Sequence, residues 1–384
     1  MHYLPSRWLR PLFAGLVALV GAVATPALAS AAPHHSAGYV YVNDNTAGTN
    51  TVSAFARHAD GSLTPVPGSP FNAGGAGTGS GLASQGAIQV SSDGRYALAV
   101  DAGSSDISVL RIEHGGRLQL IPHGVVPSGG VNPVSVAEHD GLVYVANAGP
   151  SGSDYAGFTL NAGGQLRPLP QSTVSLPADA QPGDVLFNST GTNLVGTRVG
   201  SSLIDSFRVA SDGRLTPAPG SPFAAQGAGP FGSEFRPTDP SQLFVSNAHD
   251  GAGNGSVSAF SVAADGTLSS IGASPFADLQ TAPCWVEITR NGEFLFTVNT
   301  ASGSISRYSI AADGTLTLLG STPVTSQAGV GAVDARLSTD GRTLYVDESR
   351  IAAIGEFQVS GGQLTQLGSV SLPAGSAPAG VAVR

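Results

Sequence analysis

The tetrapeptide Asp265-Gly266-Thr267-Leu268 is one copy of a phrase that recurs seven times, each time as a glycine followed two residues later by a leucine. The leucines are separated by 55, 48, 49, 53, 48 and 48 residues, and they are Leu63, Leu118, Leu166, Leu215, Leu268, Leu316 and Leu364. A period near fifty is typical of four-stranded repeats that close into a ring. The phrase therefore predicts an all-β fold, a seven-bladed β-propeller of four-stranded blades.

Each repeat also contains short apolar segments of the kind that form strands. Residues 285–293, 294–299 and 304–310 would be the first three strands of one blade, and the Gly-x-Leu phrase would then turn the chain into the fourth. Glycine supplies the positive φ that such hairpins need. Residues 38–43 match the second-strand pattern, whereas residues 377–384 match the first-strand pattern. We expect these two segments to pair in one blade and close the ring, which removes exposed sheet edges.

The first 31 residues have the pattern of a secretory signal peptide. Arg7 and Arg10 precede an apolar run at 12–23, and small residues at 27–31 offer small-x-small cleavage sites. An uncleaved anchor is the alternative, but this run is short for a bilayer span. We expect residues 1–31 to be removed, residues 32–37 to form a short tail and residues 38–384 to form a single propeller domain. That domain would be secreted or extracytoplasmic (periplasm or cell envelope), with no membrane insertion.

The net charge and the cysteine and histidine content limit the partners, disulfides and metals that we expect for this chain. The formal net charge of −9 becomes −11 without Arg7 and Arg10, and such an acidic surface repels nucleic acid and anionic membranes. Cys284 is the only cysteine, so the mature chain has no internal disulfide. The scattered histidines form no metal-ligand pattern. No metal and no cofactor are expected.

Candidate site residues are expected on the loops that join second to third strands and on those that lead into first strands, because both lie at one mouth of the channel. Glu234, Glu287, Asp334 and Arg336 stand within otherwise apolar strands, where charge is costly unless it is paired or wetted. The sequence is consistent with two roles for these residues, which are salt bridges between blades and ligand binding. Trp285 could stack on a ligand or pack between blades.

The phrase extends to D-G-x-L-T-x-x-x-G-S-P-F at 60–71 and 212–223, with a variant at 265–276. With the S-x-D-G-R-x-L-Y-V and V-S-x-F strands, it resembles the 6-phosphogluconolactonase-like propellers, a lactonase family that includes fungal 3-carboxymuconate cyclase. The resemblance covers residues 38–384 and implies a seven-bladed fold. It also implies a small-molecule lactone or organic acid as the ligand.

The catalytic positions of that family are not matched here. Where the family has G-A-G-P-R-H, this chain has GAGPFGSEF (227–235), which places Phe231 and Gly232 at the Arg and His positions. The family's N-E pair corresponds to Asn247-Ala248, and a further His corresponds to Gly86, beside Gln85. Phe, Gly and Ala supply no acid, base or cation for opening a lactone.

Two hypotheses follow. In the first, the chain is a lactonase-like hydrolase or cyclase with a relocated site at the channel mouth. Glu234, His249 and Asp334 would be catalytic, and the residues that bind substrate would be Arg198, Arg336, Trp285, Glu287 and Gln85. In the second, the chain is a non-catalytic extracytoplasmic module that binds a cell-envelope glycan, a protein or a small acid.

Overall fold

The computed structural model describes residues 36–384 except residue 151 and residues 325–330. The predicted signal peptide lies outside the described residues. The described chain is built from strands, with one short 3-10 helix, η1 (His114–Gly116). Within this part of the chain, no helix has the length and apolar character needed to cross a membrane.

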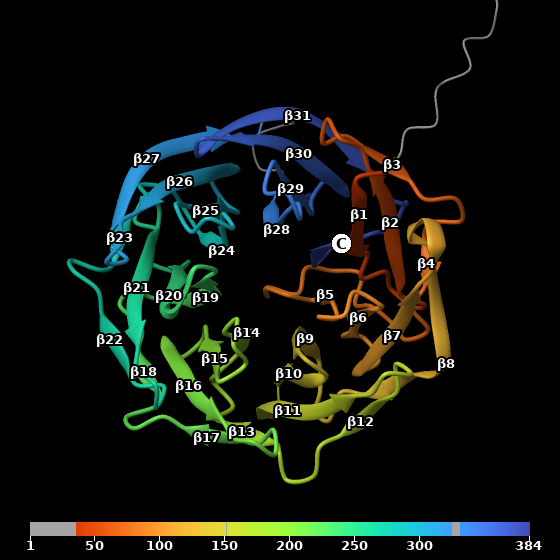
Figure 1. Cartoon of the computed structure of the whole chain (residues 1–384), viewed down its shortest axis with the longest axis horizontal. Helices are drawn as coiled ribbons and strands as arrows, with labels where there is room; N and C mark the ends of the chain where they lie inside the picture. Colours follow the sequence, from red (N-terminus) through yellow and green to blue (C-terminus); the bar gives the residue numbers. More distant parts are fainter. Residues whose placement is uncertain (1–35, 151, 325–330) are drawn as a thin grey trace, which may run out of the picture. The chain divides into compact units, whose positions relative to one another are not determined.

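Seven antiparallel sheets follow one another around a central channel (Figure 1). Blade 1 contains β1 (Gly38–Asn43), β2 (Thr51–Arg57), β3 (Leu63–Pro65), β4 (Phe71–Asn72) and β32 (Val381–Val383). Blade 2 contains β5 (Ile88–Val90), β6 (Tyr96–Asp101), β7 (Asp106–Ile112) and β8 (Leu118–Pro127). Blade 3 contains β9 (Pro133–His139), β10 (Leu142–Gly149), β11 (Gly152–Leu160), β12 (Leu166–Pro168) and β13 (Val174–Leu176).

The remaining four blades repeat the pattern. Blade 4 contains β14 (Pro182–Phe187), β15 (Asn193–Arg198), β16 (Leu203–Val209), β17 (Leu215–Pro217) and β18 (Phe223–Ala224). Blade 5 contains β19 (Pro230–Arg236), β20 (Asp239–Asn247), β21 (Ser256–Val262), β22 (Leu268–Ser270) and β23 (Phe276–Ala277). Blade 6 contains β24 (Pro283–Ile288), β25 (Phe294–Asn299), β26 (Ser304–Ile310) and β27 (Leu316–Pro323). Blade 7 contains β28 (Ala332–Leu337), β29 (Thr343–Glu348), β30 (Ala353–Ser360) and β31 (Gln363–Ser371). The predicted seven-bladed propeller is confirmed.

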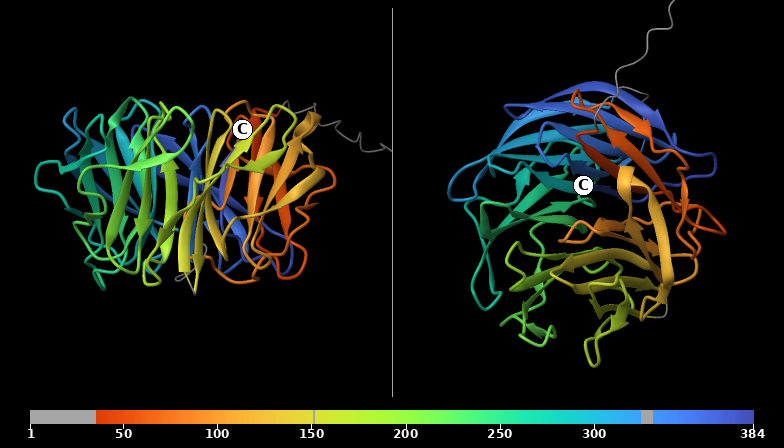
Figure 2. Two further views of the ribbon diagram at one scale, coloured as in Figure 1. Left: turned by 90° about the horizontal axis from the view of Figure 1, so that it is seen from below. Right: turned by 45° about the vertical axis from the view of Figure 1, so that its right-hand side comes forward.

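The ring closes in blade 1, as the sequence predicts. The C-terminal strand β32 pairs antiparallel with β1, in the register Val40↔Val383, Tyr41↔Ala382 and Val42↔Val381. β32 is thus the innermost strand of a blade whose other strands come from the opposite end of the chain. The left view in Figure 2 shows the ring from the side, with loops gathered at the two ends of the strands.

The recurring phrase has the same conformation in every blade. Its last glycine has positive φ in all seven copies, from 75° at Gly362 to 90° at Gly61. Where the phrase contains aspartate, as at Asp265 and Asp313, the side chain accepts the backbone N–H two residues later at 3.0 Å. The phrase leucines, Leu215 apart, are buried between blades. The phrase therefore forms a turn through its glycine and, in six of its seven copies, places a buried leucine in the packing between blades.

The core is divided among the blade interfaces. In the described chain, seven of the apolar clusters each join the facing sides of two neighbouring blades. Phe158 and Tyr96, for example, share the cluster between blades 2 and 3. Burial of one such aromatic side chain contributes about 1.5–3 kcal/mol, so stability rests on lateral stacking of blades around the ring.

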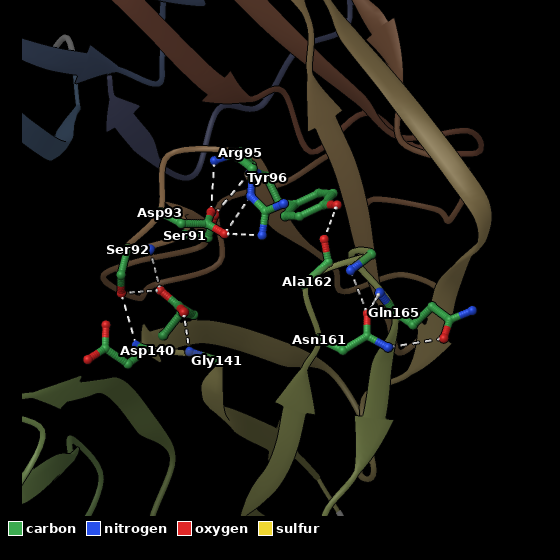
Figure 3. A network of polar contacts seen from close by, with 12 residues as sticks. Ser91, Ser92, Asp93, Arg95, Tyr96, Asp140, Gly141, Asn161, Ala162 and Gln165 are labelled. Carbon is green, nitrogen blue, oxygen red and sulfur yellow. Dashed lines mark hydrogen bonds and ion pairs between the residues drawn. The ribbon is translucent and has the colours of Figure 1, made fainter.

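Polar contacts add to this stacking at the hairpin ends of blades 2 and 3 (Figure 3). The Ser92 N–H and hydroxyl donate to Glu138 Oε2 at 2.6 and 2.8 Å, and the Tyr96 hydroxyl donates to the Ala162 carbonyl at 3.1 Å. Asp93 and Arg95 form an exposed ion pair at 2.7 Å. Each contact either pairs a polar group within a turn or joins the two blades, so this network has a structural explanation.

Candidate functional site in the central channel

The innermost strand of each blade has a free edge that faces the channel. Its N–H groups have no strand partner there, and a buried N–H without an acceptor is costly. Three carboxylates supply acceptors, and each reaches the inner strand of the next blade. The bonds run from Ser233 N–H to Asp184 Oδ2 (3.0 Å), from Leu337 N–H to Glu287 Oε2 (3.0 Å) and from Val381 N–H to Asp334 Oδ2 (2.8 Å). Charge within these strands therefore has a structural role.

Glu234 on β19 is the exception among these inner-strand acids. Within the described residues its Oε2 has no hydrogen-bond partner, and the Glu234 side chain is 19% exposed. The nearest cation is Arg336, whose Nη1 lies 3.9 Å from Glu234 Oε2. The Glu234 carboxylate thus caps no strand edge and faces a charged neighbour across the channel.

Arg336 on β28 lies between two acids. Its Nη1 is 2.8 Å from Glu287 Oε1 and 3.9 Å from Glu234 Oε2, and its side chain is 30% exposed. Solvent therefore reaches the guanidinium within the channel. Burial acts to lower the Arg336 pKa, but the surrounding carboxylates, Glu287 first, together outweigh it, so the pKa is raised and the group stays charged. One cation flanked by two carboxyls can orient a polar group or stabilise developing negative charge.

The electrostatics of this cluster keep protons on its acids near neutral pH. Loss of solvation raises the pKa of Glu234 to about 8; Glu287 adds to the rise and Arg336 opposes it. Burial likewise raises the pKa of Asp184 to about 7, and it raises that of Asp334 well above the ordinary value. A carboxyl that titrates near pH 8 is suited to proton transfer.

Gln85 crosses the channel on the mouth side of this cluster. Its N–H donates to the Gly183 carbonyl at 2.8 Å, its Nε2 donates to the Ser233 carbonyl at 3.0 Å, and its Oε1 accepts the Val286 N–H at 3.4 Å. It therefore joins the segment before β5 to the inner strands of blades 4, 5 and 6. A Cβ on Gly232 would collide with Gln85 Oε1. Glycine at position 232 thus makes room for the Gln85 side chain.

The mouth itself is apolar. A cavity of about 270 Å³ lies there, with residues 81–84, Phe231, Cys284, Thr300, Val333, Pro378 and Ala379 as its lining. A second hollow of about 480 Å³ shares Leu82, Ala83 and Phe231 with the first, and it includes His249. The mouth is formed by the predicted kinds of loop, but its lining differs from that of a charged catalytic pocket.

Phe231 and Ala248 explain this difference. They pack with Val199 and Cys284 in one apolar cluster at the mouth. Both occupy positions where the resemblance implies a charged group. Burial raises the Cys284 pKa to about 11, so its thiol is uncharged at neutral pH. The region where charge was expected is an apolar surface.

The other predicted site residues lie elsewhere. His249 is exposed at the rim of the mouth, whereas Trp285 is 1% exposed within the core between blades 6 and 7. Arg198 is bound by Asp205, with Nε 2.7 Å from Oδ2, and the Tyr155 hydroxyl donates to the same oxygen at 3.0 Å. The structure thus brings together Glu234, Glu287 and Arg336, with Asp334 and Gln85 nearby, and leaves the rest apart.

Arg198 belongs to a recurring contact that sequence reasoning missed. In five blades, a residue at or near the end of the second strand binds a residue seven positions later, which lies on the third strand or just before it. These pairs are Asn43 with Asn50, Asp101 with Ser108, Asn147 with Asp154, Arg198 with Asp205 and Asn299 with Ser306. An alignment of the repeats at equivalent positions would have indicated these polar pairs. Arg198 therefore holds the second and third strands of blade 4 together through Asp205.

Sequence reasoning also missed Ser84, and it did not assign Asp184 to the site. Ser84 lines the mouth cavity, and Asp184 binds both the N–H and the hydroxyl of Ser233, next to Glu234. Among residues 36–150, 152–324 and 331–384, no group of three or more His, Cys, Asp or Glu side chains is arranged to hold a metal ion.

Comparison with known proteins agrees with this architecture. Residues 194–379 match the family described as lactonase, 7-bladed beta-propeller. The structure is similar to that of a putative 6-phosphogluconolactonase from Bacteroides uniformis (TM-score 0.73, 17% identity, covering 91% of this chain and 100% of that one). It is also similar to the periplasmic gluconolactonase of Pseudomonas aeruginosa (TM-score 0.72, 18% identity, covering 90% and 98%). No curated protein matches the chain in sequence. The class defined by the fold is the seven-bladed β-propeller, and residues 194–379, just under half of the chain, are similar to the lactonase family of that class.

Proposed function

We propose that the chain is a lactone hydrolase whose chemistry takes place in the channel at Glu234 and Arg336. The observation that carries this proposal is the state of the Glu234 carboxylate. Its Oε2 has no hydrogen-bond partner in the described chain, and it lies 3.9 Å from a cation that solvent reaches. The family match supports hydrolase chemistry, while the residues in this role differ from those that the resemblance implies.

The reaction assigns one task to each group. Glu234 as carboxylate takes a proton from water, and the water oxygen attacks the lactone carbonyl carbon. The carbonyl oxygen gains negative charge, which the Arg336 guanidinium stabilises. The ring C–O bond then breaks, and the proton held by Glu234 passes to the departing alcohol oxygen. The product is the open hydroxy acid, and Glu234 returns to its starting form.

The test is acid release from a panel of lactones by the purified full chain. Glu234→Gln should lower kcat about 100-fold or more, because general-base catalysis supplies roughly 10²–10⁴ in rate. Glu113→Gln is the matched control, since Glu113 is a partly exposed acid that pairs with Arg111 at 3.9 Å. The kcat/KM of the unchanged chain should rise as pH increases through about 8, where Glu234 loses its proton. Equal activity of Glu234→Gln and the parent would exclude this role.

The second candidate function is ligand binding without catalysis, and the position of the Gln85 side chain favours it. This side chain spans the channel between the mouth cavity and Glu234, so a ligand held at the mouth need not reach the acids. In that case no lactone in the panel is hydrolysed and ligands still bind. Gln85→Ala separates the two candidates: it should increase hydrolysis if Gln85 limits access, and it should leave a pure binding protein without activity.

We also propose that the mature chain acts outside the cytoplasm after removal of residues 1–31. The sequence pattern of the N-terminus supports this. Expression of the full gene followed by N-terminal sequencing of the exported product is the test. An exported chain that begins near residue 32 is the expected result, and an intracellular chain that retains Met1 contradicts it.

A further inference from the structure

The mouth cavity is a separate feature from the acid cluster, and it is uniformly uncharged. None of its lining residues carries a formal charge at neutral pH: the thiol of Cys284 is protonated, and the polar side chains are hydroxyls. Among the described residues, no lysine or arginine lines it. Phosphate and carboxylate ligands need cationic or N–H donors, so this cavity does not suit an anion.

Ser84 gives a second and independent observation. It lines the cavity, it is 6% exposed, and its Oγ has no hydrogen-bond partner in the described chain. A buried hydroxyl without a partner is unfavourable. Thr300, the other hydroxyl of the lining, already donates to the Ala332 carbonyl at 2.7 Å. Rotation about the Ser84 Cα–Cβ bond would allow a ligand oxygen to supply the missing bond.

The surroundings of the cavity extend its apolar character. Five large apolar side chains are exposed in the described chain, and three of them lie on mouth-side loops: Val131 (49%), Leu279 (65%) and Ile351 (41%). Val131 and Leu279 precede inner strands, and Ile351 joins β29 to β30. The face of the ring that carries the cavity therefore also presents exposed apolar side chains.

We infer that the mouth cavity binds an uncharged small molecule with an apolar ring or acyl chain and one oxygen acceptor that pairs with Ser84. At about 270 Å³ the cavity exceeds the roughly 150 Å³ of an engineered apolar cavity that holds benzene, so a ring with a short chain fits. The cavity is too small for a protein helix, whose diameter is about 10–12 Å. This inference does not depend on catalysis at Glu234.

Two lactones with equal numbers of heavy atoms provide the test. The fluorescent, uncharged amine N-phenyl-1-naphthylamine is bound to the purified full chain and then displaced with γ-decanolactone or glucono-δ-lactone. We expect γ-decanolactone to displace the probe at a concentration at least about ten-fold lower than the hydroxylated lactone, since only the former has the apolar chain that the lining favours. Equal displacement by both lactones, or no binding of the probe, overturns the inference.

Variants locate the binding. Leu82→Asp places a carboxylate in both mouth hollows and should weaken probe binding about ten-fold or more. Leu367→Asp is the matched control because Leu367 is 43% exposed on β31, outside the lining. Ser84→Ala should weaken displacement by γ-decanolactone several-fold. Bound probe should also slow labelling of Cys284 by N-ethylmaleimide, and unchanged labelling places the probe elsewhere.

The result is separable from the test of hydrolysis. Binding is read without turnover, and Glu234→Gln should bind the probe as the parent does. A chain that binds the probe and hydrolyses no lactone contradicts only the proposed hydrolase. A chain that hydrolyses polar lactones and does not bind the probe contradicts only the inference about the mouth cavity.

Discussion

Glu234 differs from the neighbouring acids in what its carboxylate does for the fold. Asp184, Glu287 and Asp334 each accept a strand-edge N–H, so their burial is partly offset by a hydrogen bond. Glu234 accepts none at Oε2 and keeps its cost of desolvation. A residue that destabilises the fold without a structural return is a candidate for function.

This cost predicts how stability depends on pH. The ordinary pKa of Glu234 is 4.5, and in the folded chain it is about 8. Between these values the folded state holds a proton that the unfolded state releases, so the free energy of unfolding falls as pH rises. Asp184, with a folded pKa of about 7, contributes with the same sign up to that pH. We expect the chain to be less stable at pH 9 than at pH 6 by on the order of 1 kcal/mol or more.

Urea unfolding at pH 6, 7.5 and 9 measures this dependence. Glu234→Gln removes the titrating group, so the fall in stability above pH 7 should become smaller, while Glu113→Gln should follow the parent. A parent that gains stability from pH 6 to pH 9 would show that the channel acids are ionised throughout. In that case Glu234 could not serve as the base that titrates near pH 8.

At the scale of elements, the turn in each Gly-x-Leu phrase is where sequence and structure agree most directly. Blade 7 offers a matched pair of glycines in one turn, Gly361 with φ 54° and Gly362 with φ 75°. A Cβ on Gly361 meets nothing within 4 Å, whereas a Cβ on Gly362 collides with the Phe294 ring of blade 6. Both substitutions incur the backbone cost of positive φ, and only the second disturbs packing between blades.

Gly362→Ala should therefore destabilise the chain more than Gly361→Ala. The backbone term is about 1–2 kcal/mol at either site, and overpacking against Phe294 adds about 1–3 kcal/mol. Chemical denaturation of the two variants beside the parent gives the difference. Equal losses would mean that the phrase glycine is needed for its conformation alone and that the blade interface yields to the extra methyl group.

Local patterns predicted the strands, turns and ring closure because each depends on residues close in sequence or on a regular repeat. The candidate site was less accessible for a physical reason. Gln85 meets Ser233 and Val286 across 148 and 201 residues, and no local signal encodes such contacts. Strand charge pointed to Glu234, Glu287 and Arg336, and the structure places these three side chains close together. Arg198 does not join this cluster because it binds Asp205, seven residues later. Only the register of the β15–β16 hairpin shows that these two residues are close.

At the scale of the whole molecule, closure of the ring and the channel site depend on the same short strand. β32 covers the free edge of β1, and Val381 of β32 and the preceding Gly380 also bind side chains of blade 7. Val381 N–H binds Asp334 Oδ2 at 2.8 Å, and Gly380 N–H binds Asp347 Oδ2 at 3.1 Å. Loss of β32 would therefore expose one sheet edge and leave two buried carboxylates without these donors.

Deletion of residues 380–384 tests this dependence on the full chain. We expect a lower melting temperature by several degrees or more, because two buried acids lose hydrogen bonds worth about 1.5–3 kcal/mol each and the β1 edge becomes open to other chains. Thermal unfolding with size-exclusion chromatography measures both effects, and Arg384→Ala is the control that removes the terminal side chain and keeps the strand. A truncated chain that stays monomeric and melts with the parent would show that the other six blades hold the ring closed without β32. Lateral packing between blades 1, 2 and 7 would then be sufficient for closure, and the hydrogen-bonded seam would serve only to arrange Asp334 and its neighbours in the channel.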